Sequence, residues 1–326
     1  MDALVRLTLN LKGVWTTPWQ SDSLLGSLAC MWARFRGTAA LKKDFLDRWT
    51  ENDPPFVLSD AFPEGTLPTP VALPLLWEWP QERRKEIKRC PWLTLRQFRD
   101  VQVARQPDIA PRPNGSLAPI GHHIRLRNSV GRGAPASEDA SVRLFEVPYA
   151  TLDRPDRGLT LYARASQNGL KLLLESLDML GKVGFGADAS VGHGAFQIRS
   201  DPEACPELDD IPDADGFISL STYQPGQTDP VDGYWRTFVK YGKMAPEFHD
   251  ANVIFKRPQV MLVPGSCFRT PGYPKPFYGN CVRPDDLLAP GDRDTLATRG
   301  VHPVQAAFAL AVPMKWPNRG DGRERD

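Results

Sequence analysis

The sequence has few cysteines, and none of them are spaced as metal ligands usually are. The five cysteines stand at positions 30, 90, 205, 267 and 281. An odd number without a Cys-x2-Cys pair indicates neither a disulfide framework nor a zinc site. Paired carboxylates are missing as well, because Asp22, Asp60 and Asp188 lie in separate segments. We therefore expect free thiols, no bound metal and no cofactor.

Long hydrophobic runs are also missing. No apolar stretch approaches the roughly 20 residues that a membrane-spanning helix needs, although 41% of the residues are hydrophobic and can fill a core. Met1 and Asp2 lead directly into a strand-like segment, without the pattern of a signal peptide. These features predict a soluble cytoplasmic protein with no membrane partner. A length of 326 residues is typical of two domains.

Two Gly-x-Gly pairs form the most informative segment. Gly184 and Gly186 are separated by five residues from Gly192 and Gly194. Before them, leucines with helical spacing predict a helix over residues 168–180, capped by Asn168 and ended by Gly181, and residues 195–198 resemble a strand. This order argues against the Walker and Rossmann glycine motifs, in which the glycines follow a strand and open a helix.

Closely spaced glycines can expose backbone N–H groups and form a concave binding site for an anion such as a phosphate. The alternative is that they only make tight turns. The charge distribution favours the anion: the net charge is +1, yet residues 81–132 contain twelve Lys or Arg against four Asp or Glu. Such clustering is typical of a polyanion contact, whereas a solvated basic face is the simpler explanation.

The order of predicted elements indicates an α+β protein. Residues 4–12 alternate as a half-buried strand, a helix begins at Ser21 or Asp22, and further strands are expected at 144–147 and 158–164, before the helix and strand around the glycines. Strand, helix, strand, strand, helix, strand is the ferredoxin-like order. After an acidic, proline-containing stretch over 201–216, the pattern supports only further strands.

The spacing Gly-x-Gly-x5-Gly-x-Gly after a helix resembles the glycine-rich loop of the RAMP (repeat-associated mysterious protein) superfamily of CRISPR RNA-binding proteins. Within it, the chain most resembles the subunit that caps type III-A (Csm) effector complexes at the 5′ tag of the guide RNA. Further matching segments are residues 21–28, 58–63, 67–70 and 302–304.

This resemblance implies two ferredoxin-like (RRM-like) domains. The first would cover residues 1–200 with a basic insertion at about 81–140, in which residues 83–89 are expected to form a short helix and residues 106–137 a hairpin. The second, divergent domain would cover residues 201–317, and residues 318–326 would be a disordered tail. It also implies a noncatalytic subunit that binds the 5′ tag of the crRNA and nearby target RNA, and that docks the large polymerase/cyclase-like subunit to a backbone RAMP subunit. The equivalent subunit of another type III subtype is an alternative.

The candidate RNA-binding residues come from three segments. The glycine loop contributes Gly184, Phe185, Gly186, Ser190, Gly192, His193 and Gly194. The start of the first helix contributes Ser21 and Ser23, although serine at this place is more commonly a simple cap. The resemblance also places a thumb-like hairpin beside the guide, and its matching residues are His122, His123, Arg125, Arg127 and Arg132.

Two other functions remain open. Some RAMP proteins cut precursor guide RNA with a histidine, and His122, His123 and His193 are candidates by residue type. The second open function is that of a structural protein in which the glycines only make turns. We expect the noncatalytic binding role, because the resembled subunit is regarded as noncatalytic.

Overall fold

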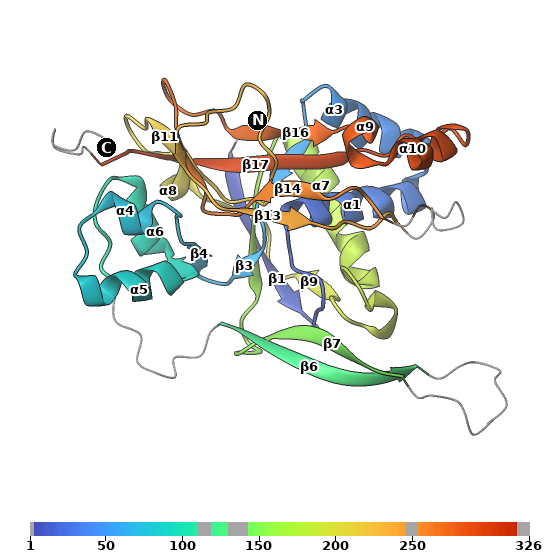
Figure 1. Ribbon diagram of the computed structural model, residues 1–326, viewed down its shortest axis with the longest axis horizontal. Coiled ribbons are helices and arrows are strands. Elements are labelled where there is room, and N and C mark those ends of the chain that lie inside the picture. Colours follow the sequence, from blue (N-terminus) through green and yellow to red (C-terminus); the bar gives the residue numbers. More distant parts are fainter. Residues whose placement is uncertain (1–2, 110–118, 130–142, 246–252, 254, 318–326) are drawn as a thin grey trace.

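A computed structural model describes residues 3–109, 119–129, 143–245, 253 and 255–317 (Figure 1). The predicted RNA contact Arg132 and the predicted disordered tail, residues 318–326, lie outside the described residues.

The first half of the chain holds most of the helices. Its strands are β1 (Leu4–Leu11), β2 (Phe56–Leu58), β3 (Phe62–Pro63), β4 (Thr66–Pro68), β5 (Trp92–Thr94), β6 (Ile120–Ser129), β7 (Arg143–Leu152), β8 (Leu159–Ala165) and β9 (Phe196–Ile198). Its helices are α1 (Ser21–Arg36), α2 (Thr38–Leu41), the π-helix η1 (Lys42–Leu46), α3 (Asp47–Thr50), α4 (Leu73–Leu76), α5 (Gln81–Arg89), α6 (Leu95–Gln102), α7 (Gln167–Val183) and the 3-10 helix η2 (Ala189–Val191).

The second half consists mainly of strands. These are β10 (Glu203–Ala204), β11 (Gly216–Ser219), β12 (Gly233–Tyr234), β13 (Thr237–Lys240), β14 (Gln259–Leu262), β15 (Cys267–Arg269), β16 (Phe277–Val282) and β17 (Gln305–Met314). The helices are α8 (Pro206–Asp209), α9 (Pro284–Leu287) and α10 (Pro290–Ala297). The predicted α+β class is confirmed.

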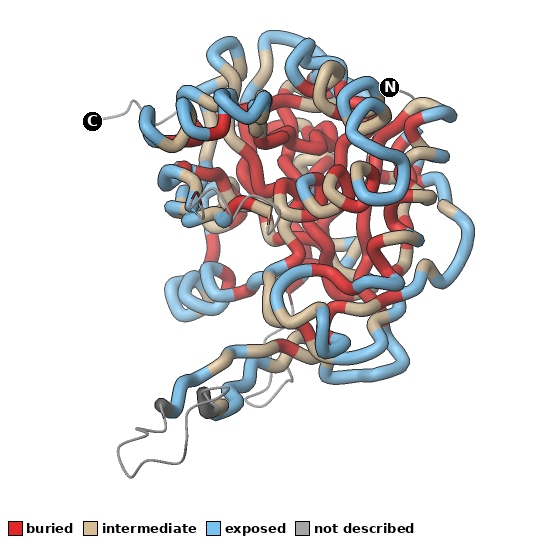
Figure 2. Tube along the Cα trace, turned by 90° about the vertical axis from the view of Figure 1, so that its right-hand side faces the viewer, coloured by how far each residue is buried: buried red, intermediate tan, exposed pale blue. Residues whose placement is uncertain are grey.

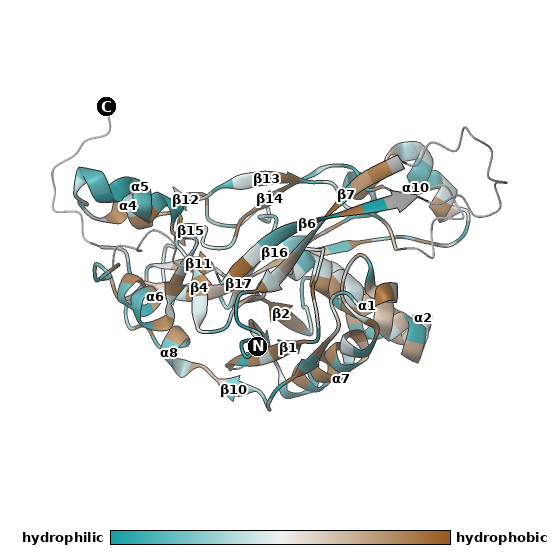
Figure 3. Cartoon of the chain, turned by 90° about the horizontal axis from the view of Figure 1, so that it is seen from below, coloured by the Kyte–Doolittle hydropathy of each residue, from teal (hydrophilic) through white to brown (hydrophobic). Residues whose placement is uncertain are grey.

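The first sheet has the order β10-β1-β8-β2, with β9 also pairing with β1 and β3 with β8, and all these pairs are antiparallel. The predicted strands 4–12, 158–164 and 195–198 correspond to β1, β8 and β9 of this sheet. The predicted strand 144–147 does not belong to it: these residues lie in β7, which pairs with β6 in a separate sheet, and β2 takes the place beside β8. Helices α1 and α7 lie against each other, as Figures 1 and 3 both show.

Helix α7 is longer than the leucine spacing predicts. Its cap is Ser166, whose hydroxyl accepts from the Gly169 amide at 3.2 Å, so the predicted cap Asn168 lies inside the helix. The predicted end, Gly181, also lies inside the helix. Glycine is needed there for packing, because a Cβ would stand 2.6 Å from the Phe196 carbonyl oxygen of β9. The helix ends instead at Gly184, which has a φ of +98°.

The second sheet has the order β12-β15-β11-β17-β16, and β13 and β14 form a separate two-stranded ribbon. Every residue of β17 is buried. One large hydrophobic cluster contains residues of both halves, including Leu24, Phe56, Leu310 and Val312. The predicted boundary at residue 200 therefore does not separate two independent cores, and buried segments run through the middle of the molecule (Figure 2).

The basic segment 81–140 is not a single hairpin. Its first part forms helices α5 and α6, and α6 begins with a capping box in which Thr94 and Gln97 exchange hydrogen bonds. Strand β6 then pairs with β7 over ten residues to form a hairpin that projects from the molecule (Figures 1 and 2). Helix α5 thus covers the short helix expected at residues 83–89, and β6 contains the expected hairpin arm, residues 123–127.

Candidate nucleic-acid interface

The linker between β1 and α1, residues 12–20, holds the glycine loop (residues 184–194) and the hairpin together. Trp15 and Ala150 of β7 exchange two backbone hydrogen bonds, at 3.1 and 2.7 Å. The Thr16 hydroxyl donates to the Ala187 carbonyl at 2.8 Å, and the Ala187 amide donates to the Thr17 hydroxyl at 2.9 Å. Two segments that the sequence selects separately are thus fixed to one short stretch of chain.

One face of the hairpin carries cations. Because side chains alternate along a strand, His123, Arg125 and Arg127 share this face with Tyr149, which pairs directly with His123. The His123 ring stacks on Tyr149 at 5.2 Å, and the Arg125 guanidinium lies over the same ring, also at 5.2 Å. A histidine nitrogen, Nε2, also lies 3.1 Å from the Thr151 hydroxyl. The tyrosine therefore orders two of the predicted RNA-binding side chains.

The opposite face of the hairpin is apolar and solvent-exposed. Ile124 and Leu126 are each 64% exposed, and Leu144 on β7 is 67% exposed. The predicted contact His122 is exposed on this apolar face, so it lies on the opposite side of the hairpin from His123. Apolar and polar residues alternate along this part of β6, which Figure 3 colours by hydropathy.

Arg127 connects the hairpin to the glycine loop. Its guanidinium lies 3.1 Å from the carboxylate of Asp188, and the same carboxylate oxygen is 4.0 Å from Nδ1 of His193. His193 is buried, with 7% of its surface exposed, and its Nδ1 has no hydrogen-bond partner among the described residues. The structure thus brings two predicted residues, Arg127 and His193, to one acidic side chain.

Most amides of the glycine loop are not free. The N–H groups of Gly184, Phe185 and Gly194 donate to the carbonyls of Leu180, Gly194 and Val14, at 2.7 to 2.9 Å. Those of Gly192 and His193 donate within the loop, to Ala189 and Asp188. The expected concave set of free glycine amides is therefore wrong for these five residues.

A smaller set of amides remains without an acceptor. In the described part of the chain, no atom accepts from the N–H groups of Gly186, Asp188, Ala189 or Ser190. Gly186 and Ser190 are exposed. Three of the four are consecutive and open the 3-10 helix η2, where free N–H groups favour an anion. The anion site that the geometry supports is centred on residues 186–190.

Two loop residues have structural roles. Phe185 is 1% exposed and its ring lies 4.7 Å from that of Trp19, so it belongs to the core and its side chain cannot reach RNA. Gly186 has a φ of +88°, and a Cβ there would stand 2.4 Å from Cβ of Thr17. Turn formation, the alternative function of the glycines, thus applies to part of the loop.

The predicted contact at the start of α1 is wrong for Ser21. This residue is fully buried, and its hydroxyl donates to the Thr222 carbonyl at 2.8 Å. Its amide donates to the carboxylate of Asp60 at 2.8 Å, so the Ser21 N–H is not free for a phosphate. Ser23 is partly buried and its hydroxyl accepts from the Lys240 ammonium at 2.8 Å.

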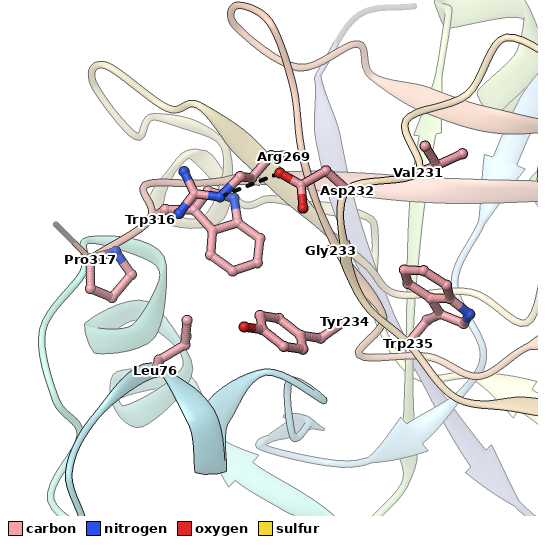
Figure 4. A pocket seen from close by; sticks show the side chains of 9 residues that line it. All are labelled: Leu76, Val231, Asp232, Gly233, Tyr234, Trp235, Arg269, Trp316 and Pro317. Atoms are coloured by element: carbon pink, nitrogen blue, oxygen red, sulfur yellow. Dashed lines mark ion pairs between the residues drawn. The ribbon is translucent and has the colours of Figure 1, made fainter. Parts of the chain in front are cut away.

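A cavity of about 550 Å³ lies elsewhere, between the α4 region, β12, β15 and the end of β17 (Figure 4). Its lining includes Tyr234, Trp235 and Trp316, and the Arg269 guanidinium lies 4.7 Å from the Trp316 ring and 3.8 Å from the Asp232 carboxylate. No periodic pattern or motif predicts this cavity, and the adjacent aromatic residues 234 and 235 are the one local signal for it. Its lining combines apolar and aromatic side chains with the Arg269–Asp232 ion pair.

The metal-ligating side chains, the cysteines and the lengths of the helices bear on two other kinds of site. No group of three metal-ligating side chains occurs among the residues that the structure describes, and none of the five cysteines, which all lie in described segments, forms a disulfide. Burial raises the pKa of the Cys205 and Cys267 thiols to about 12. Within the described ranges, every helix is too short or too polar to cross a membrane.

No protein-family model and no curated protein matches the sequence. Solved structures do match. Csm4 in a crystal structure of the Csm1-Csm4 cassette in complex with pppApA has a TM-score of 0.64 and 16% identity, over 97% of this chain and 100% of that one. In the complex with cA4 the TM-score is 0.63, at 15% identity and the same coverage.

A third match comes from a different assembly. In the Csm3-Csm4 subcomplex of the type III-A CRISPR-Cas interference complex, the TM-score is 0.59 and the identity 12%, over 96% of this chain and 100% of that one. The shared component of these structures is Csm4. The chain therefore has the fold of Csm4, in agreement with the RAMP resemblance of its glycine-rich segment.

Proposed function

We propose that this chain is a guide-RNA-binding subunit of a type III-A CRISPR effector complex that holds the 5′ tag of the crRNA. The observation that carries the proposal is the shared fold over the whole length of Csm4, a protein found with Csm1 in one set of structures and with Csm3 in another. By this analogy, the chain joins a large polymerase-like subunit to the RAMP backbone, and its two halves are ferredoxin-like units.

The geometry of the hairpin and loop supports an RNA contact. Arg125 and His123 are exposed and ordered by Tyr149, and the free amides of Gly186 and of residues 188–190 lie on the loop that Arg127 contacts. Guanidinium groups bridge phosphates or stack on unpaired bases, and free amides bind phosphate oxygens. Both kinds of donor are fixed to the linker 12–20, so a single strand of RNA can contact them together.

We infer that the subunit is noncatalytic. A general base has to reach the 2′-hydroxyl of the RNA within hydrogen-bond distance. The His193 side chain is almost fully buried beside Asp188. His123 is exposed, but its Nε2 lies 3.1 Å from the Thr151 hydroxyl, and His122 lies on the opposite face of the hairpin, so the two adjacent histidines do not face one phosphate as an acid–base pair. No other observation favours cleavage. Incubation of the purified chain with repeat RNA, with and without metal, tests this directly: cleavage that His123→Ala or His193→Ala abolishes would refute the inference.

Copurification tests the binding role. The tagged chain would be isolated with its natural partners, and the bound RNA sequenced. Arg125→Gln removes a hairpin cation, and Ser190→Glu places a carboxylate beside the free loop amides. We expect both variants to retain less crRNA, because each weakens contacts to phosphate. Matched controls are Arg293→Gln, an exposed arginine on α10, and Gln197→Glu, an exposed position on β9.

The outcome separates assembly from RNA binding. Loss of crRNA with retention of the protein partners supports the assignment of the site. Equal crRNA retention by all four variants contradicts it, and absence of any Csm-type partner contradicts the proposed complex.

A further inference from the structure

Exposed aromatic side chains flank the ribbon β13–β14, and together with its exposed valines they form what we call its outer face. Tyr241 is 73% exposed, Phe255 60% and Trp235 44%. Between them, Val239 and Val260 pair directly across the ribbon and are also half exposed. Large apolar side chains on an exposed sheet face indicate a binding surface.

The charges of this ribbon have one sign. Residues 235–245 and 255–263 contain five Lys or Arg and no Asp or Glu. Two of the five point inward: Lys240 bonds to Asp22 at 2.6 Å, and Lys256 bonds to Gln305 at 2.9 Å. The other three are exposed, and none forms an ion pair with a carboxylate of the described residues: Arg236, Lys243 and Arg257.

Two of the aromatic rings are held in place. The Trp235 ring stacks on Phe268 at 5.5 Å with an angle of 15° between the rings, at the edge of the cavity in Figure 4. At the other end, the Lys243 ammonium lies 5.6 Å from the Phe255 ring. With a rise of about 3.3 Å per residue, Trp235 and Tyr241 are about 20 Å apart, which is the length of several nucleotides.

We propose that the outer face of β13–β14 is a second contact for single-stranded RNA, in which bases stack on Trp235, Tyr241 and Phe255 while Arg236, Lys243 and Arg257 lie near phosphates. Exposed aromatics interleaved with cations that no carboxylate neutralises are the usual platform for a single strand. Figure 3 shows the ribbon on the same side of the molecule as the distal part of the hairpin. The inference rests on the proposed function in that both surfaces contact one RNA.

The test measures the affinity of the full-length protein for a fluorescein-labelled oligouridylate of about 12 nucleotides, by fluorescence anisotropy at fixed salt. Tyr241→Ala and Phe255→Ala should each weaken binding by about 5- to 100-fold, because each removes a stacking platform. Tyr241→Phe keeps the ring and should bind as the unmodified protein does. Val260→Ser, which changes an exposed neighbour without a ring, is the matched control.

Several results would overturn the inference. Unchanged RNA affinity in both alanine variants would refute it, as would an equal loss in Val260→Ser. Loss of a copurified protein partner without loss of RNA affinity would assign the surface to protein docking instead. Because Arg125→Gln is measured in the same assay, failure of the ribbon and failure of the hairpin are distinguished. Unfolding midpoints of all variants identify any loss caused by misfolding.

Discussion

Replacement of Asp60 by asparagine should change how the stability of the protein depends on pH. The Asp60 carboxylate is buried between the two halves of the chain. One oxygen accepts from the amides of Ser21, at 2.8 Å, and Thr222, at 2.7 Å, and the other accepts from the Thr222 hydroxyl at 2.7 Å. These bonds join the start of α1 to the segment that follows β11.

Burial raises the pKa of Asp60 from 3.8 to about 6, and the three hydrogen bonds offset part of that shift. Between pH 4 and pH 6 the unfolded chain loses this proton while the folded chain keeps it. The free energy of unfolding therefore falls as the pH rises through this window, and the contribution is constant above it. A shift of about two units corresponds to about 3 kcal/mol.

The assay is urea denaturation of the unmodified protein and of Asp60→Asn between pH 4 and pH 8. Asparagine does not titrate, so other groups cancel in the difference between the two unfolding free energies. Between pH 4 and pH 6.5, the unfolding free energy of the unmodified protein should fall by about 3 kcal/mol relative to that of Asp60→Asn. A constant difference, or one of opposite sign, would refute the reasoning. Asp53→Asn, at an exposed carboxylate, is the control.

Three further predictions concern the proposed RNA site. Gly186→Ala should destabilise the protein by about 1–3 kcal/mol in thermal unfolding, and more than Gly192→Ala, because only the first Cβ clashes, with Thr17, although both residues have positive φ. Arg127→Gln should speed hydrogen exchange of the β6–β7 amides, because it removes the contact with Asp188; unchanged exchange would show that this ion pair does not hold the hairpin. RNA affinity should fall as salt rises, with a log–log slope of about −0.7 for each phosphate contact, and a slope near zero in a salt titration would contradict phosphate binding.

The sequence predicted the local order of the glycine segment but not its surroundings. Leucine spacing indicated α7, and helix-to-strand succession is a local property that the chain itself encodes. What the glycines contact is not local: Gly186 faces Thr17, and the Gly194 amide donates to Val14. A motif shows that backbone can approach closely, and only the fold shows whether protein or ligand makes the approach.

The same limit applies to Ser21. Serine before an apolar helical repeat correctly predicted where α1 begins. The residue that caps the helix is however Asp60, which is 39 positions away along the chain, and Thr222 of the second half covers the serine hydroxyl. Because one core crosses the middle of the chain, contacts between its halves decide which polar residues remain accessible, and no periodic pattern encodes them.

The two proposed RNA surfaces are joined through the start of α1. Lys240, on the inner side of the β13–β14 ribbon, bonds to Gln20 at 2.7 Å and to Asp22 at 2.6 Å, at the point where the linker 12–20 meets the helix. The other end of that linker holds the hairpin and the glycine loop. An RNA strand that contacts both surfaces would therefore bind elements that are already fixed relative to one another, so less conformational entropy is lost on binding. On this reasoning, Lys240→Met should weaken RNA binding although the Lys240 side chain itself points away from the proposed RNA surface.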